Sequence, residues 1–168
     1  MRLSPLMLAL GLTASAMAVP SFANFAQPAD IAPISLELVE EGKAALEAGD
    51  LVAADNAFEA ALVADPRNGT AYVEMAKVAM QQRLYGQAIR LSRKALTIDP
   101  TDRSALAAQG EAYAALGAVA KAEANLAKLE RICAAECVEQ DRIAAAIARG
   151  PQLAEAEAED ILEVEEAN

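Results

Sequence analysis

Small and apolar residues recur along the middle of the chain at helical spacing, and the pattern repeats every 34 residues. The clearest markers are the steps Asp65-Pro66 and Asp99-Pro100. Each step marks a helix end, because proline lacks an amide donor and disfavours a helical residue before it. No segment shows the sustained two-residue alternation that a half-buried strand needs. The pattern therefore predicts an all-α chain built from repeated helix pairs.

Turns rich in Gly, Asp and Pro divide the chain into seven expected helices. Their predicted spans are 35–48, 51–64, 69–82, 86–98, 103–116, 119–132 and 138–149. An alternative is an alanine-rich bundle in which the two Asp-Pro turns share a spacing by accident, because Ala fits almost any helix position.

Seven slots carry the repeat. They hold Leu38, Gly42, Ala45, Ala54, Phe58, Ala61 and Pro66 in the first unit, Tyr72, Ala76, Ala79, Ala88, Ser92, Ala95 and Pro100 in the second, and Leu106, Gly110, Tyr113, Ala122, Leu126, Leu129 and Ala134 in the third. This series resembles the tetratricopeptide repeat, in which small residues let two helices approach and large ones fill the gap between them. The departures are the absence of Trp, Glu41 in a slot that prefers Leu, and the missing closing Pro of the third unit.

The resemblance implies a right-handed α-solenoid of about three repeats, 35–68, 69–102 and 103–136, in a domain of residues 35–150 with a capping helix at 138–149. In this family the first helix of each repeat lines a concave groove that accepts a partner's segment. The groove residues would be Leu36, Val39, Lys43, Leu46 and Glu47, then Thr70, Val73, Lys77, Met80 and Gln81, then Ser104, Ala107, Glu111, Ala114 and Ala115.

One feature of the groove limits its expected activity, and one alternative interpretation of the whole stripe stays open. Val39, Val73 and Ala107 stand where the family's carboxylate-gripping sub-type needs polar or basic groups, so we do not expect that activity. The alternative for the whole stripe is that neighbouring helices simply bury it.

The two ends of the chain differ from the body. Residues 1–23 read as a signal peptide, with Arg2, an uncharged apolar run and cleavage after Ala23 or, as a second option, Ala18. An uncleaved membrane anchor is the rival interpretation. Residues 24–34 read as a linker, and residues 151–168 as an acidic, solvated tail with seven acids and no base. The expected location is the periplasm or the exterior.

Cys133 and Cys137 are the only cysteines, and a pair in an exported chain favours a disulfide. The stretch from Leu126 to Ile147 resembles the cysteine-paired ends of exported repeat proteins of proteobacteria. A redox-active pair is the alternative, although the chain has no C-x-x-C sequence.

The remaining composition argues against catalysis. The chain has no histidine, which excludes Ser–His–Asp and Cys–His sites and removes the commonest zinc ligand. No phosphate-binding glycine motif is present, so we expect no enzyme activity, cofactor or metal. Arg83, Arg90, Arg93 and Lys94 form a basic cluster that could meet an anionic partner or the acidic tail, or form ion pairs with nearby acids.

Of the net charge of −11, the acidic tail holds −7 and the signal peptide +1, which leaves the body at −5. The body shows no broad basic face to neutralise phosphates, so nucleic-acid binding is not expected. The sequence therefore predicts an exported scaffold or adaptor that binds another envelope protein in its groove, with no stable membrane span after signal cleavage. The alternative function is a periplasmic chaperone or carrier that holds a small apolar ligand between helices.

Overall fold

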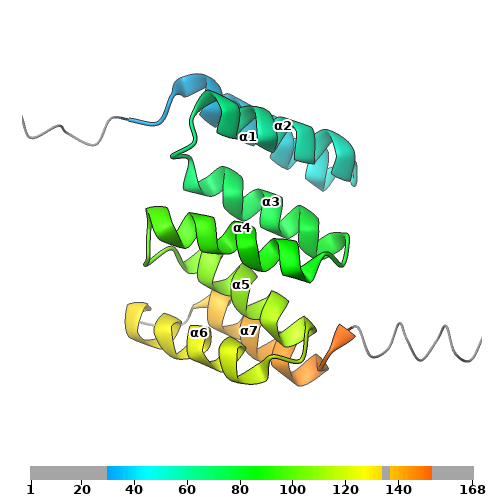
Figure 1. Ribbon diagram of the computed structural model, residues 1–168, viewed down its shortest axis with the longest axis vertical. Helices are drawn as coiled ribbons and strands as arrows, with labels where there is room; N and C mark the ends of the chain where they lie inside the picture. The colour runs from blue at the N-terminus through cyan, green and yellow to red at the C-terminus, as the bar shows by residue number, and fades with distance from the viewer. Residues whose placement is uncertain (1–29, 134–136, 153–168) are drawn as a thin grey trace, which may run out of the picture.

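The computed structural model describes residues 30–133 and 137–152, which form seven α-helices and no strand. Successive helices run antiparallel and stack in layers along one axis (Figure 1). The helices are α1 (Pro33–Glu47), α2 (Leu51–Ala64), α3 (Gly69–Gln81), α4 (Tyr85–Ile98), α5 (Arg103–Ala115), α6 (Val119–Ile132) and α7 (Val138–Arg149). The predicted all-α solenoid is confirmed. The expected signal peptide, residues 24–29 of the linker and the tail from residue 153 lie outside the described residues.

The helix bounds agree with the predicted ones to within two residues, because local chemistry fixes the ends. The side chains of Asp50, Asn68 and Asp102 accept hydrogen bonds from the backbone N–H three residues on, at 2.9, 3.4 and 2.9 Å. These bonds cap α2, α3 and α5. The first helix begins at Pro33, two residues before the predicted start, with proline in its first turn.

One turn conformation recurs between the two helices of each pair. Gly49, Arg83 and Gly117 occupy the same position of successive repeats and have φ of 80°, 58° and 73°. Glycine adopts this left-handed conformation freely, whereas a side chain makes it costly. The second repeat therefore uses the same turn geometry with a less suitable residue.

Two helical glycines mark the closest approaches between helices. A Cβ atom built on Gly42 would lie 2.6 Å from Cδ1 of Phe58, the fully buried ring of α2. A Cβ atom built on Gly110 would lie 2.6 Å from Cδ1 of Ile143, which comes from α7 and not from α6. The predicted role of these glycines, close helix approach, is therefore seen at both positions, with a different partner helix at the second.

The odd-numbered helices form the inner side of the stack. Each of α1, α3 and α5 contacts the helix that follows it and also the next odd-numbered one: α1 contacts α3, α3 contacts α5, and α5 contacts α7. The even-numbered helices do not approach one another as closely. The side on which successive helices approach most closely is the concave side of a solenoid, so α1, α3, α5 and α7 line the concave face.

Candidate functional site

The concave face is open at its N-terminal part and covered at its C-terminal part. On α1 and α3, Leu36, Thr70 and Gln81 are exposed, and Lys43, Leu46, Lys77 and Met80 are half-buried. On α5 the predicted groove residues Ala107, Ala114 and Ala115 are buried. The helix that covers this part of α5 is α7, which packs against both α5 and α6.

Three of the buried groove residues occupy the same slot of successive repeats. Val39 and Val73 are only 2% and 3% exposed, and Ala107 is fully buried. Val73 packs with Ala95 and Ala105, from α4 and α5. The expectation that Val73 offers its side chain to a partner is therefore corrected: adjacent layers approach closely enough to cover this position of each repeat.

An open hollow remains where the N-terminal parts of α1 and α3 meet. It has a volume of about 430 Å³ and is lined by Leu36, Glu37, Val39, Glu40, Lys43 and Thr70. We call it the α1–α3 hollow. Its apolar wall is Leu36, which is 49% exposed, and the buried Val39. Ile34, 53% exposed, precedes Leu36 on the same helix. The hollow combines one exposed apolar side chain, Leu36, with polar groups at its rim, as docking sites for protein segments do.

The charges beside the concave face are already paired. Lys43 Nζ lies 2.8 Å from Glu40 Oε1, and Lys77 Nζ lies 2.7 Å from Glu74 Oε1. Farther along, Arg142 of α7 lies 2.6 Å from Glu111 of α5. Burial raises the pKa of Glu111, and Arg142 partly opposes this shift. The bases of this face are thus paired with acids of the same face, and Glu37, which lines the α1–α3 hollow, is in none of these pairs.

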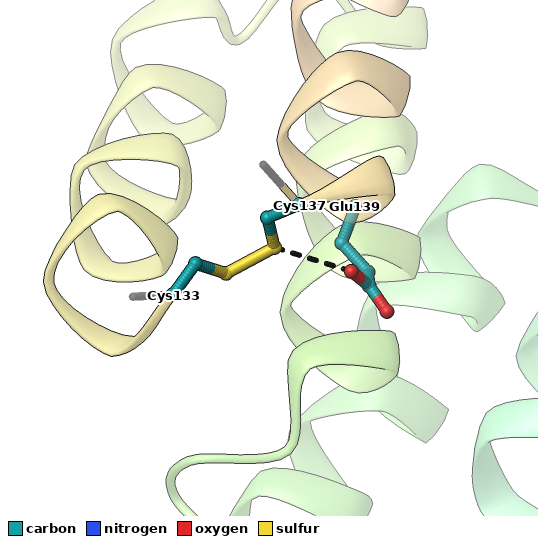
Figure 2. Close-up of a disulfide and its surroundings, with 3 residues drawn as sticks. All are labelled: Cys133, Cys137 and Glu139. Carbon is teal, nitrogen blue, oxygen red and sulfur yellow. Dashed lines mark hydrogen bonds between the residues drawn. A yellow bond between two sulfur atoms is a disulfide. The ribbon is translucent and has the colours of Figure 1, made fainter. Parts of the chain in front are cut away.

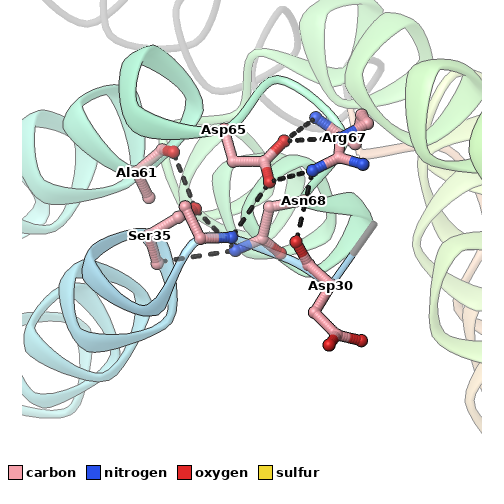
Figure 3. A network of polar contacts seen from close by, with 7 residues as sticks. Asp30, Ser35, Ala61, Asp65, Arg67 and Asn68 are labelled. Carbon is pink, nitrogen blue, oxygen red and sulfur yellow. Dashed lines mark hydrogen bonds and ion pairs between the residues drawn. The ribbon is translucent and has the colours of Figure 1, made fainter. Parts of the chain in front are cut away.

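A polar network ties the start of α1 to the turn between α2 and α3 (Figure 3). Asp65 accepts hydrogen bonds from the backbone N–H of Ala32 at 3.0 Å and from the Arg67 guanidinium at 2.8 and 3.0 Å. The hydroxyl of Ser35 donates to the carbonyl of Ala61, and Asn68 Nδ2 donates to that hydroxyl at 2.9 Å. The network fixes the angle at which α1 enters the stack, and α1 carries Leu36.

The same network determines the ionisation of Asp65. The Arg67 guanidinium, then the backbone N–H groups of Arg67 and Ala32, hold the pKa of this carboxyl well below its usual range. The sequence identified Asp65-Pro66 only as a helix end. The polar role was missed, although Ser35, Arg67 and Asn68 are the kind of residues that signal such a network.

The basic cluster lies on α4 and the turn before it. Arg83, Arg90, Arg93 and Lys94 are all exposed. The ion pairs of residues 30–133 and 137–152 use Lys43, Arg67, Lys77 and Arg142, and none of them involves these four bases. The interpretation that nearby acids of the folded body neutralise the cluster is therefore wrong.

The two cysteines lie at the junction of α6 and α7. Figure 2 shows the disulfide between Cys133, which follows α6, and Cys137, which precedes α7. Their Cα atoms are 6.0 Å apart, which a disulfide accommodates. Cys137 Sγ also lies 3.1 Å from Glu139 Oε2. The connection at 134–136, between the helices predicted at 119–132 and 138–149, lies outside the described residues.

Two further observations limit the chemistry of the described part of the chain. It contains no group of three or more His, Cys, Asp or Glu side chains placed to hold a metal ion. No helix described here has the length and apolar character that crossing a membrane would take.

Comparison with solved structures identifies the class of fold. The translocator chaperone SycD of type III secretion from Yersinia enterocolitica matches with a TM-score of 0.63 at 16% identity, over 70% of this chain and 92% of that one. The Arabidopsis OM64 TPR domain matches with a TM-score of 0.62 at 22% identity, over 69% and 93%. The first TPR of Spaghetti (RPAP3), bound to the HSP90 peptide SRMEEVD, matches with a TM-score of 0.62 at 19% identity, over 68% and 96%.

The fold is thus that of tetratricopeptide-repeat (TPR) domains. No protein-family model and no curated protein matches this chain by sequence.

Proposed function

We propose that this protein is an exported, non-catalytic binding module that holds a segment of another envelope protein on the α1–α3 part of its concave face. The observation that carries the proposal is the α1–α3 hollow. Leu36 stands half exposed at its edge, and Val39 supplies a buried apolar floor. Exposed apolar surface beside a concave polar rim is stabilised when a partner's apolar side chain covers it.

The structural neighbours support a protein segment as the ligand, but they do not indicate the sequence of that segment. One is a TPR domain bound to a peptide of HSP90, and another is a translocator chaperone. In this chain Val39 and Val73 are buried valines, and Lys43 and Lys77 are paired with acids of their own helices. These residues do not favour the gripping of a terminal carboxylate. We therefore propose a partner segment recognised through an apolar side chain.

The carrier alternative has less support. A half-open pocket between α3, α5, α7 and the start of α4 is lined by Met80, Tyr85, Glu111 and Arg149, among others, and holds about 150 Å³. Sites for small molecules typically hold about 300–1,000 Å³ and are mostly apolar. This pocket is small, and two of its lining residues are charged.

Export is the second part of the proposal. It rests on the predicted signal peptide at 1–23 and on the cysteine pair, which suits an oxidising compartment. N-terminal sequencing of the protein from its host's envelope fraction should find Asn24 as the first residue. An intact Met1 would contradict this part alone and leave the groove proposal standing.

The binding face is tested by a matched pair of substitutions. Leu36→Glu places a charge at the edge of the hollow, whereas Val63→Glu places one on α2, where Val63 is 86% exposed. A photo-reactive residue at Thr70, which lines the hollow, should crosslink to one discrete polypeptide in living cells. Leu36→Glu should reduce that product by about tenfold or more, because a charge facing an apolar partner is desolvated without compensation.

Val63→Glu should leave the crosslinked product unchanged, and both variants should melt within a few degrees of the parent, since both sites face solvent. Equal products in the two variants would place the binding face elsewhere. A small molecule found on the native protein by mass spectrometry, without a crosslinked polypeptide, would favour the carrier.

A further inference from the structure

The bases of α4 form a continuous face with no acid among them. Arg90, Arg93 and Lys94 line one shallow hollow of about 330 Å³ together with Thr97. The sequence of α4 contains no Asp or Glu, so no partner is available one helical turn away. Arg83 precedes the helix and shares a second hollow with Arg90. We call these four bases the α4 basic face.

The described chain ends near the start of α4, the helix that carries this face. Gly150 ends α7, and Pro151 then lies against the turn between α5 and α6, where a Cβ atom on Gly117 would come within 3.3 Å of Pro151 Cγ. Gln152 shares a pocket with Tyr85, the first residue of α4. Figure 1 shows the end of α7, that turn and the start of α4 at the same side of the stack.

The residues that follow complement the face in charge. Between 153 and 168 the sequence has Glu155, Glu157, Glu159, Asp160, Glu163, Glu165 and Glu166 and no base. A stretch of this length can span up to about 50 Å, whereas α4 is about 20 Å long. Leu84 and Leu116, 47% and 39% exposed, lie beside Arg83 and Arg90 and could receive Ile161 or Leu162.

We propose that the acidic C-terminal segment, residues 153–168, docks on the α4 basic face of its own chain. Docking neutralises four exposed bases that the folded body leaves unpaired, and it shields the face from other anionic polypeptides. The attraction is between exposed charges, so it weakens as the Debye length falls from about 10 Å at 0.1 M salt to about 3 Å at 1 M. This contact is independent of the α1–α3 hollow.

Zero-length crosslinking tests the contact, because a carbodiimide joins a lysine amine to a carboxylate only when the two touch. The purified protein with its C-terminus intact is treated at low salt, and crosslinked peptides of the monomer are mapped. We expect Lys94 to be the main lysine joined to residues 155–166, well above Lys43, Lys77 and Lys121. Arg90→Gln/Arg93→Gln should reduce the Lys94 product by at least about fourfold, about twofold for each exposed charge removed.

The control Lys128→Gln/Arg131→Gln removes the same charge from exposed positions of α6 and should leave the product unchanged. Loss of the product at 1 M salt supports an electrostatic contact. The proposal is overturned if all lysines are joined to the tail to a similar extent, if Lys43 and Lys77 dominate, or if the products link only two different chains. No Lys94 product at low salt also overturns it.

Discussion

Gly42→Ala is the substitution that most directly tests how the first helix pair is packed. The new Cβ atom would lie 2.6 and 2.8 Å from Cδ1 and Cζ of Phe58, far inside ordinary contact distance. Phe58 is fully buried among Val39, Ala54, Met75 and others, so its ring has no open space to enter. Either the ring or the whole of α2 must move.

Two opposing effects set the size of the change. Overpacking a tight contact costs about 1–3 kcal/mol, while Ala in a helix interior is favoured over Gly by about 0.5–1 kcal/mol. The net loss of unfolding free energy should be about 1–2 kcal/mol, which lowers Tm by about 4–8 °C for a domain of this size. Thermal unfolding followed by circular dichroism measures it.

Gly86→Ala is the matched control. Gly86 also lies in a helix, and the nearest atom to its built Cβ is Nη1 of Arg90 at 3.8 Å. Only the propensity gain remains, so Tm should stay the same or rise slightly. Phe58→Leu should recover part of the loss when combined with Gly42→Ala, because the smaller side chain makes room. If Gly42→Ala is as stable as Gly86→Ala, the close approach of α1 and α2 is wrong.

Two other perturbations probe the stack. Val73→Glu should lower the free energy of unfolding by about several kcal/mol, and Tm steeply with it, because an unpaired carboxylate would enter the contact with Ala95 and Ala105. An unchanged Tm would show that Val73 is exposed after all. Asp65→Asn should destabilise at neutral pH but progressively less as pH falls below about 4, the ordinary aspartate range. The sign follows from the lowered pKa of Asp65, whose stabilising charge is present above that range and is lost on protonation. A stability difference between parent and variant that stays constant from pH 6 to pH 2 would contradict this role.

The sequence predicted the helices well because their ends are decided locally. Asp50, Asn68 and Asp102 cap helices through their own side chains, and each Asp-Pro step prevents the helix from continuing. These signals need no knowledge of the rest of the fold. The repeat of 34 residues then shows which helices form each pair, and this inference needs no knowledge of how the helices pack.

The groove was less predictable because exposure depends on how closely the layers approach. The periodic slot that holds Val39, Val73 and Ala107 marks the correct side of each helix, but it does not say how much of that side the next layer covers. The covering of α5 also depends on α7, whose Ile143 reaches Gly110. No local feature of residues 103–115 shows that a helix beginning at residue 138 will pack there.

The position of α7 explains why the open part of the concave face lies at α1 and α3. A stack of three helix pairs leaves the inner side of its last pair uncovered, and α7 covers it by packing on α5 and α6. At the other end the described chain supplies no such helix, and Ile34 and Leu36 stay half exposed. The Asp65 network nevertheless holds the start of α1 firmly in place. An exposed apolar side chain such as Leu36, on a helix fixed in this way, is prepared for contact, because binding a partner there requires little further ordering of the protein.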